Sequence, residues 1–158
     1  MTNESRRILF VCTGNICRSP VAQYLAARLA RDAGLSWTVA SAGVEAEIGC
    51  GMTPGAVRSL ASRGVRGALH VARRLDERML ADSDQVYALT DAHRRIIAAR
   101  FPAHAGKISI LRSAAGLSDA DVEDPYGESD AVYEECAARI EEALKILIRR
   151  NSHVENHR

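Results

Sequence analysis

The fold is decided by the stretch ILFVCTGNICRSPVAQ, residues 8–23. Residues 8–11 are an apolar run with the length and composition of a buried strand. After a short polar loop, apolar residues recur at helical spacing, at Val21, Leu25 and Leu29. Ser19 and Pro20 predict the start of this helix, with Ser19 as N-cap and Pro20 at the first helical position. The sequence therefore predicts a strand, a tight loop and a helix whose N-terminus closes the loop.

The loop, residues 12–19, has the features of an anion site. Its backbone N–H groups have no strand partners, and the helix N-terminus adds partial positive charge. Gly14 and Asn15 tolerate the left-handed backbone that a concave loop requires. The planar fork of Arg18 can bind two oxygens of a phosphate. No Gly-Lys-Ser/Thr follows the glycine, so the pattern differs from a nucleotide-binding loop.

Cys12 is the residue at which the strand enters this loop. A free thiol with a pKa of about 8.5 is only a few per cent thiolate at neutral pH. Loop N–H groups, Arg18 and the helix terminus all favour the thiolate. We therefore expect Cys12 to be a nucleophile beside a bound phosphoryl group, the alternative being an inert core cysteine.

The run VCTGNICRSP, residues 11–20, strongly resembles the low-molecular-weight protein tyrosine phosphatase family, in its bacterial form. The resemblance extends over nearly the whole chain to Arg150. It implies a cysteine-dependent hydrolase that removes phosphate from phosphotyrosine through a phosphocysteine intermediate, with phosphorylated proteins as substrates and inorganic phosphate as product. It implies no cofactor and no metal. The implied phosphate-binding residues, besides Cys12 and Arg18, are Thr13, Gly14, Asn15, Ile16, Cys17 and Ser19.

Composition sets the broad class of the protein. The 158 residues predict one domain, which we expect to span residues 1–150, followed by a polar tail at 151–158. An apolar content of 47% excludes a disordered chain, and a net charge of +1 disfavours a nucleic-acid partner. The start MTNESRR lacks an apolar signal region, and no stretch is long enough to span a membrane. We expect a cytoplasmic protein without a membrane partner, and its scattered cysteines lack a metal-site spacing.

Strand and helix patterns alternate along the chain. Strands are predicted at 8–11, 37–40, 85–89 and 107–111, and helices at 20–33, 53–64, 75–81, from 90 or 91 to 101, and 132–148. A polar, acidic loop is expected at 113–128. This alternation predicts an α/β fold with a parallel sheet, helices on both faces and a ligand at the C-terminal ends of the strands. The resemblance implies a four-stranded, flavodoxin-like sheet in the order 2-1-3-4.

A general acid is expected in VEDPYG, residues 122–127. A phosphate ester expels a poor leaving group at neutral pH unless an acid protonates it. From the residues alone, Asp124 is as well explained as part of a solvated turn. The family carries its general acid in an Asp-Pro-Tyr motif here, so the resemblance implies that Asp124 protonates the leaving group and then activates water. Asp121 is the weaker candidate.

The resemblance also implies a supporting hydrogen-bond network of Asn15, Ser19, Ser41 and His70. The network would hold Asn15 in a left-handed conformation and let Ser19 donate to the thiolate. Without the resemblance, Ser41 reads as a turn residue and His70 as a partly buried histidine. Cys17 has two interpretations: a packing residue, or a redox partner that forms a disulfide with Cys12 and protects it from over-oxidation.

Substrate preference follows from departures from the family pattern. Residues 44–49 lack the usual aromatic wall, which leaves Tyr126 and Ile16 to flank the substrate. This loop and residues 93–97 resemble the protein-arginine phosphatase branch, but that branch has Thr where Ile16 stands. Ile16 therefore favours phosphotyrosine, and phosphoarginine remains the alternative. Arsenate reductase is disfavoured because residues 79–90 contain no cysteine. A non-catalytic phosphate-binding module is disfavoured because Cys12 and Asp124 are both present.

Overall fold

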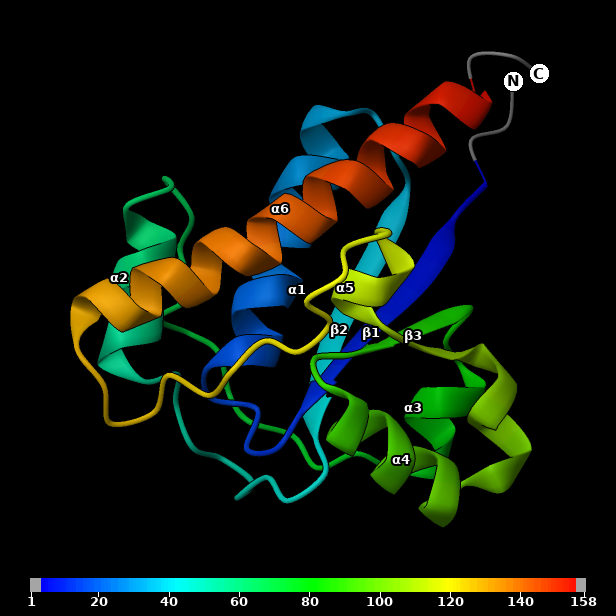
Figure 1. Ribbon diagram of the computed structural model, residues 1–158, viewed down its shortest axis with the longest axis horizontal. Coiled ribbons are helices and arrows are strands. Elements are labelled where there is room, and N and C mark those ends of the chain that lie inside the picture. The colour runs from blue at the N-terminus through cyan, green and yellow to red at the C-terminus, as the bar shows by residue number, and fades with distance from the viewer. Residues whose placement is uncertain (1–3, 156–158) are drawn as a thin grey trace.

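The computed structural model describes residues 4–155, with the backbone alone for 154 and 155. Within that range, one parallel sheet has the order β2-β1-β3-β4, which confirms the predicted topology (Figure 1). Its strands are β1 (Arg6–Cys12), β2 (Trp37–Gly43), β3 (Gln85–Ala88) and β4 (Ile108–Ile110). The order changes direction beside β1, so the C-terminal end of β1 lies at the topological switch point, where ligands bind in such sheets.

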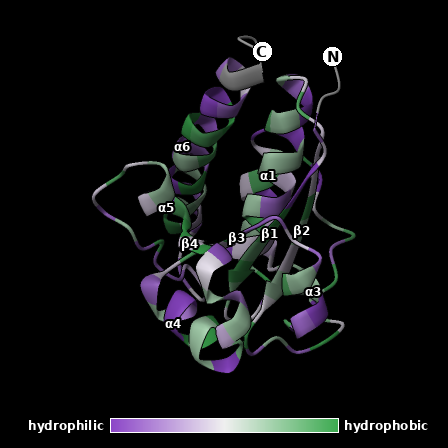
Figure 2. Cartoon of the chain, turned by 90° about the vertical axis from the view of Figure 1, so that its right-hand side faces the viewer, coloured by the Kyte–Doolittle hydropathy of each residue, from purple (hydrophilic) through white to green (hydrophobic). Residues whose placement is uncertain are grey.

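Helices cover both faces of the sheet, as predicted (Figure 2). One face carries α1 (Arg18–Asp32), α2 (Pro54–Ala61) and α6 (Asp130–Glu155), and the other carries α3 (Glu77–Ala81) and α4 (Asp91–Arg100). A 3₁₀ helix, η1 (Pro102–Lys107), precedes β4, and α5 (Leu111–Ala114) follows it. Both faces of the sheet are therefore buried, which explains the continuous apolar run of β1.

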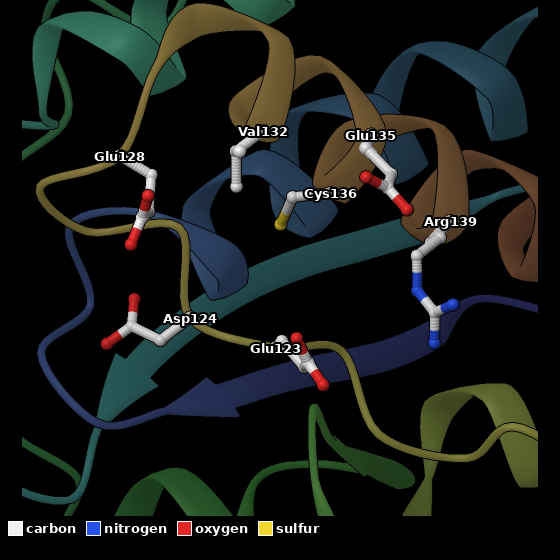
Figure 3. Close-up of a pocket in the computed structure, with 7 residues that line it drawn as sticks. All are labelled: Glu123, Asp124, Glu128, Val132, Glu135, Cys136 and Arg139. Atoms are coloured by element: carbon white, nitrogen blue, oxygen red, sulfur yellow. The ribbon is translucent and has the colours of Figure 1, made fainter.

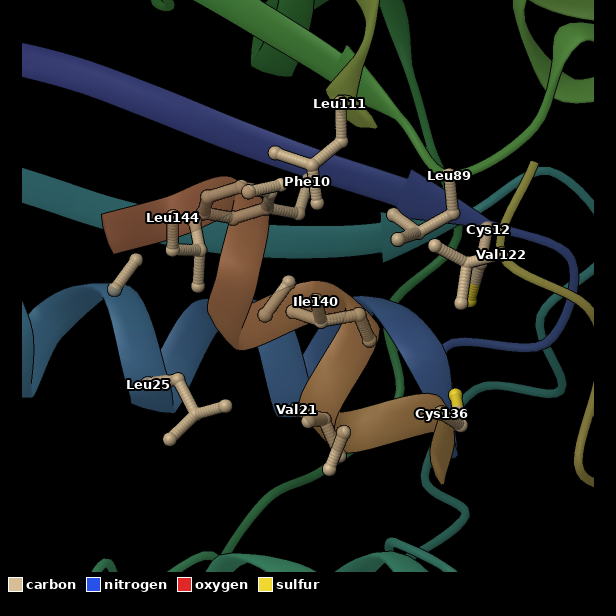
Figure 4. Close-up of a cluster of buried hydrophobic side chains, with 14 of the residues drawn as sticks. Phe10, Cys12, Val21, Leu25, Leu89, Leu111, Val122, Cys136, Ile140 and Leu144 are labelled. Carbon is tan, nitrogen blue, oxygen red and sulfur yellow. The ribbon is translucent and has the colours of Figure 1, made fainter. Parts of the chain in front are cut away.

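Side chains of β1 alternate between two apolar cores. Ile8, Phe10 and Cys12 lie in the cluster shared with α1 and α6, whereas Leu9 and Val11 lie in the cluster shared with α4. Figure 4 shows Cys12 at the edge of the first cluster, beyond Phe10 and near Val122. The period of two along the strand thus directs the thiol toward the N-terminus of α1.

The expected start of the first helix is wrong by two residues. α1 begins at Arg18, and Cys17 rather than Ser19 is its N-cap. The first-turn N–H groups point into the loop, where Ser19 N lies 3.4 Å from Cys12 Sγ. Pro20 still costs no hydrogen bond, because the helical ladder starts with Val21 N donating to Cys17 O at 3.2 Å.

The stretch between β4 and α6 is not wholly a loop, because α5 occupies its start. Buried Arg112 on α5 contacts Asp119 Oδ1 at 2.6 Å and Glu142 Oε2 at 3.0 Å, which fixes this segment to α6. α6 passes residue 150 without a break and ends at Glu155, so residues 151–155 are helical rather than a frayed tail. Residues 156–158 lie outside the described range, and the division into 1–150 and 151–158 stays a prediction.

Candidate active site

The loop of residues 12–19, called the phosphate-binding loop below, joins β1 to α1. Cys12 ends β1 and is buried, and its thiol forms no disulfide. Its sulfur lies 2.9 Å from Ser19 Oγ and 3.4 Å from Ser19 N. Both groups can donate to a thiolate, and the first turn of α1 adds its partial positive charge. The sulfur of the predicted nucleophile is thus surrounded by hydrogen-bond donors.

Asn15 is the only residue other than glycine with a positive φ among residues 4–155, at 55°. Its Nδ2 donates to Ser19 Oγ and Ser41 Oγ, each at 2.8 Å. Its Oδ1 accepts from Arg73 N at 3.0 Å, and its carbonyl oxygen lies 2.8 Å from His70 Nε2. The structure therefore brings the residues of the expected network within hydrogen-bond distance of one another. These contacts hold Asn15 in a backbone conformation that is otherwise disfavoured.

Further members of this network could not be read from the sequence. Ser41 Oγ donates to Gln23 Oε1 at 2.6 Å, and Tyr24 OH lies 3.4 Å from His70 Nδ1. Burial, the largest cause, lowers the pKa of His70, which favours its neutral ring. Gly43 permits β2 to approach the loop, because a Cβ at this position would lie 2.5 Å from Thr13 O. The only sequence signal for this contact is the small-residue end of β2.

Arg18 connects the phosphate-binding loop to residues 119–128, called the acid loop below. Its Nη1 donates to Val122 O at 3.0 Å, and its Nη2 lies 3.8 Å from Asp124 Oδ2. The side chain is buried, yet its Nε has no partner in the described part of the chain. A buried donor without an acceptor is costly, and an oxyanion held by the loop would supply one.

Asp124 is exposed, and its Oδ1 accepts from Tyr126 N at 3.1 Å. Asp124 lines a cavity of about 460 Å³ between the acid loop and α6 (Figure 3). The lining residues are Glu123, Asp124, Glu128, Val132, Glu135, Cys136 and Arg139. Asp121, the weaker candidate for the acid, is already engaged: its Oδ1 accepts from Asp91 N, the first residue of α4, at 2.8 Å. The geometry thus favours Asp124 as the acid that is free to meet a substrate.

The expected substrate wall is mainly aliphatic in the structure. Ile16 is partly buried, with its Cγ1 3.5 Å from the position of a Cβ on Gly14. Tyr126 is 65% exposed. Leu69, which no sequence pattern indicated, is 95% exposed. It precedes His70, whose ring contacts the carbonyl oxygen of Asn15 in the phosphate-binding loop.

Cys17 is buried as N-cap of α1. Its sulfur lies 3.2 Å from Thr53 Oγ1 and 3.6 Å from Tyr133 OH. Burial raises the pKa of this thiol. The protective disulfide with Cys12 stays a prediction. Cys136 is buried on α6, and burial raises its pKa to about 12, which makes it unreactive.

A further contact of the loop comes from α4. His93 Nε2 lies 2.8 Å from Thr13 Oγ1, and its Nδ1 lies 2.9 Å from Thr90 Oγ1. From the sequence, His93 was only one of the residues 93–97 that resemble the protein-arginine phosphatase branch. Two broader features concern residues 4–155 as a whole: no cluster of three or more His, Cys, Asp or Glu side chains could hold a metal, and no helix is long and apolar enough to cross a membrane.

Comparison with known proteins agrees with this geometry. The family model described as low molecular weight phosphotyrosine protein phosphatase matches residues 7–157. The protein-arginine-phosphatase of Bacillus subtilis is 39% identical over 140 residues, covering 89% of this chain and 93% of that protein. The low molecular weight protein-tyrosine-phosphatase of Streptomyces coelicolor is 38% identical over 150 residues, covering 90% of this chain and 91% of that protein.

A solved structure completes the comparison. The YwlE arginine phosphatase, in a Cys-to-Ser mutant with a phosphorylated active-site serine, superposes with a TM-score of 0.88. It shares 37% identity, and the match covers 91% of this chain and 94% of the other. A strand–loop–helix anion site built around a buried thiol, together with these likenesses, leads to one conclusion: the chain belongs to the low molecular weight phosphotyrosine protein phosphatase family and is a cysteine-dependent phosphatase.

Proposed function

We propose that the protein hydrolyses phosphotyrosine in phosphoproteins, with Cys12 as nucleophile, Arg18 as phosphate ligand and Asp124 as general acid and base. The observation that carries this proposal is the buried Cys12 sulfur, 2.9 Å from Ser19 Oγ, beside a buried Arg18 whose Nε has no partner among the described residues. These groups stabilise negative charge at two adjacent places, on the thiolate and on the phosphoryl oxygens. Such a site suits transfer of a phosphoryl group to sulfur.

The reaction proceeds in two steps. In the first, the Cys12 thiolate forms the S–P bond, the ester P–O bond breaks, and Asp124 gives its proton to the leaving oxygen. In the second, a water molecule gives a proton to the Asp124 carboxylate and attacks phosphorus. The S–P bond then breaks, which releases inorganic phosphate and regenerates the thiolate. The reaction uses only groups of this chain and water, and the thiol requires a reducing compartment such as the bacterial cytoplasm.

Ile16 supports the choice of phosphotyrosine. Its partly buried aliphatic side chain flanks Gly14 in the loop, and Tyr126 of the acid loop offers an exposed aromatic ring. A phenyl ring gains from such surfaces, whereas a guanidinium would lose hydration against Ile16 without gaining a hydrogen bond. An unpaired buried polar group costs about 1–3 kcal/mol, which corresponds to roughly tenfold or more in selectivity.

Phosphoarginine is the second candidate substrate, and two observations favour it. The Bacillus subtilis protein-arginine-phosphatase is 39% identical over 93% of its length. The loop at 44–49 also lacks the aromatic residue that the tyrosine phosphatases usually carry. The two candidates share Cys12, Arg18 and Asp124, so only the groups that flank the leaving group separate them.

The deciding experiment compares kcat/KM on peptides that differ only in phosphotyrosine or phosphoarginine. We expect wild type to prefer phosphotyrosine and Ile16→Thr to shift the ratio toward phosphoarginine by about tenfold. Ile146→Thr is the matched control, because it makes the same change at an aliphatic side chain that is also partly buried but lies on α6, outside both loops. A wild type that hydrolyses phosphoarginine far better than phosphotyrosine would reject the preference based on Ile16.

A further inference from the structure

The first turn of α4 carries a chain of hydrogen bonds that ends in the phosphate-binding loop. Thr90 caps the helix, and its Oγ1 accepts from His93 N at 3.2 Å. The ring of His93 then lies between two hydroxyls, with Nδ1 2.9 Å from Thr90 Oγ1 and Nε2 2.8 Å from Thr13 Oγ1. Thr13 directly follows the nucleophile, while His93 comes 80 residues later. The contact therefore joins two segments that only the fold brings together.

The environment of His93 determines which nitrogen donates. Burial and the nearby charge of Arg18 lower the pKa of His93 to about 4, against the opposite influence of Asp121 and Asp124. At neutral pH the ring is neutral and has one N–H. The hydroxyl of Thr90 is buried and finds its acceptor in Nδ1, whereas Thr13 is exposed. We therefore assign the ring proton to Nε2, so that Nε2 donates to Thr13 Oγ1.

The same turn of α4 also holds the acid loop. Asp91 N donates to Asp121 Oδ1 at 2.8 Å, three residues before Asp124. Next to α4, Leu89 O accepts from Val122 N at 3.0 Å. One short segment thus contacts both the residue after the nucleophile and the residues that lead to the acid.

Thr13 is held from its other side as well. Its carbonyl oxygen accepts from Glu45 N at 2.9 Å, and Gly43 of β2 packs against the same oxygen. The backbone of Thr13 is thus bound on the β2 side of β1, and its side chain on the β3 side, where α4 begins. Among residues 4–155, the hydrogen bond to His93 is the one side-chain hydrogen bond that holds Thr13 on the β3 side of the loop entrance.

We propose that His93 is a positioning residue of this phosphatase: by donating from Nε2 to Thr13 Oγ1, it fixes the entrance of the phosphate-binding loop to the helical turn that also holds the acid loop. Among the described residues, the hydrogen bonds of His93 go to Thr13 and Thr90 and not to Cys12 or Arg18. The inference rests on the proposed hydrolysis by Cys12 and Asp124, and it is independent of whether tyrosine or arginine carries the phosphate. It assigns a role in orientation, because both loops must keep their relative place within a fraction of an ångström.

Two amide substitutions separate this role from simple stabilisation of α4. Gln at 93 can place its amide N–H where His93 Nε2 lies and so retain the donor to Thr13. Asn at 93 can reach only the position of Nδ1 and so retain the contact with Thr90. We expect His93→Gln to keep kcat/KM for p-nitrophenyl phosphate within about threefold of wild type, and His93→Asn to lose about tenfold. The melting temperatures should rank in the opposite order, with His93→Asn above His93→Gln, because only Asn keeps the buried contact to Thr90.

A double-mutant cycle with Thr13→Val identifies the partner. If His93 acts through Thr13, His93→Asn should cost little in the Thr13→Val background, so that the double variant loses about as much as the worse single variant. Vanadate affinity should follow the same pattern as kcat/KM. Ile97→Val, a core change in the same helix, controls for general loosening of α4 and should leave both quantities unchanged.

Several results would overturn the proposal: equal activity of the Gln and Asn variants, a reversed order, or multiplicative losses in the cycle. If neither His93 variant folds, Thr13→Val and Thr13→Ser decide, since only Ser keeps the hydroxyl; equal activity of those two variants would reject the role of the contact. The proposed function is tested separately by wild-type turnover. If wild type fails to turn over p-nitrophenyl phosphate, the hydrolysis fails, while the ranking of vanadate affinities still decides the positioning role.

Discussion

The two loops that carry the proposed chemistry are built in opposite ways. In the phosphate-binding loop, Asn15 and Ser19 are fully buried and their side chains bind one another and the surrounding elements. In the acid loop, the side chain of Asp124 is 55% exposed and Tyr126 is 65% exposed. In the proposed mechanism, the groups that face negative charge are thus fixed in advance, whereas the group that would exchange protons remains open to the leaving group and to water.

Energetics give the reason for this difference. A donor aimed at a thiolate or phosphate stabilises charge most when no reorganisation is needed at the moment of reaction. Buried polar groups are tolerated only when they are satisfied, so the phosphate-binding loop needs its dense network. The acid loop has no such requirement. Substitutions in the two loops should therefore separate activity from stability in different ways.

The largest effect should come from Cys12→Ser. The hydroxyl is a far weaker nucleophile than the thiolate, so kcat should fall by about 10⁴-fold or more. The backbone donors and Arg18 survive, so the fold and the binding of phosphate or vanadate should remain. Steady-state kinetics and vanadate titration measure both quantities. Sustained turnover by this variant would exclude a phosphocysteine intermediate.

Asp124→Asn should lower kcat by about 10²–10³-fold on phenyl phosphate, since the amide cannot protonate the leaving oxygen. The loss should be smaller on p-nitrophenyl phosphate, whose leaving group needs less protonation. Because this side chain is exposed, the urea midpoint should stay close to that of wild type. An equal loss on both substrates would show that Asp124 does not act as the acid.

A smaller effect concerns the stability of the fold at low pH. It comes from His93, which contacts Thr13 of the phosphate-binding loop. The ordinary pKa of histidine is near 6.5, and burial together with Arg18 lowers that of His93 to about 4. Between these values the unfolded chain binds a proton that the folded chain does not, so stability falls as pH drops from about 6.5 to about 4. A shift of this size corresponds to about 3 kcal/mol.

The matched comparison for this prediction is His93→Gln, which cannot titrate. Urea unfolding at pH 7 and pH 4 should show a smaller loss of free energy for the variant than for wild type, by about 3 kcal/mol. His70, whose pKa burial also lowers, is present in both proteins and so cancels. Parallel stability curves would mean that His93 titrates normally in the folded state.

What the sequence could predict depended on distance along the chain. The strand, the loop and the contact between Cys12 and Ser19 lie within one short stretch, so local patterns and the family resemblance located them. The exception was the start of α1. Cap preferences indicated Ser19 as N-cap, whereas the helix begins at Arg18 and the N–H of Ser19 donates to the sulfur of Cys12. At this position the requirements of the site override the local cap preference.

Contacts between separate strand ends could be predicted only where the family resemblance named the residues, as for Ser41 and His70. The bonds from Arg73 N to Asn15 and from His93 to Thr13 depend on which loops meet at the C-terminal edge of the sheet. Asp121 was considered as an acid because it is polar and close to Asp124, whereas its carboxylate accepts a hydrogen bond from Asp91 N at the start of α4. Hydropathy and spacing carry no signal for such pairs, since any exposed loop can present the same residue types.

One feature of the phosphate-binding loop has a consequence for the order of events during synthesis. The loop lies near the N-terminus, yet Arg18 contacts Val122 across 104 residues and Cys17 contacts Tyr133 across 116 residues. A growing chain therefore makes its nucleophile early and cannot complete the pocket around it until α6 has left the ribosome. Until then the thiol is without its full set of neighbours, so an incomplete chain should lack phosphatase activity. Activity should consequently appear only after α6 has been synthesised and has docked onto α1.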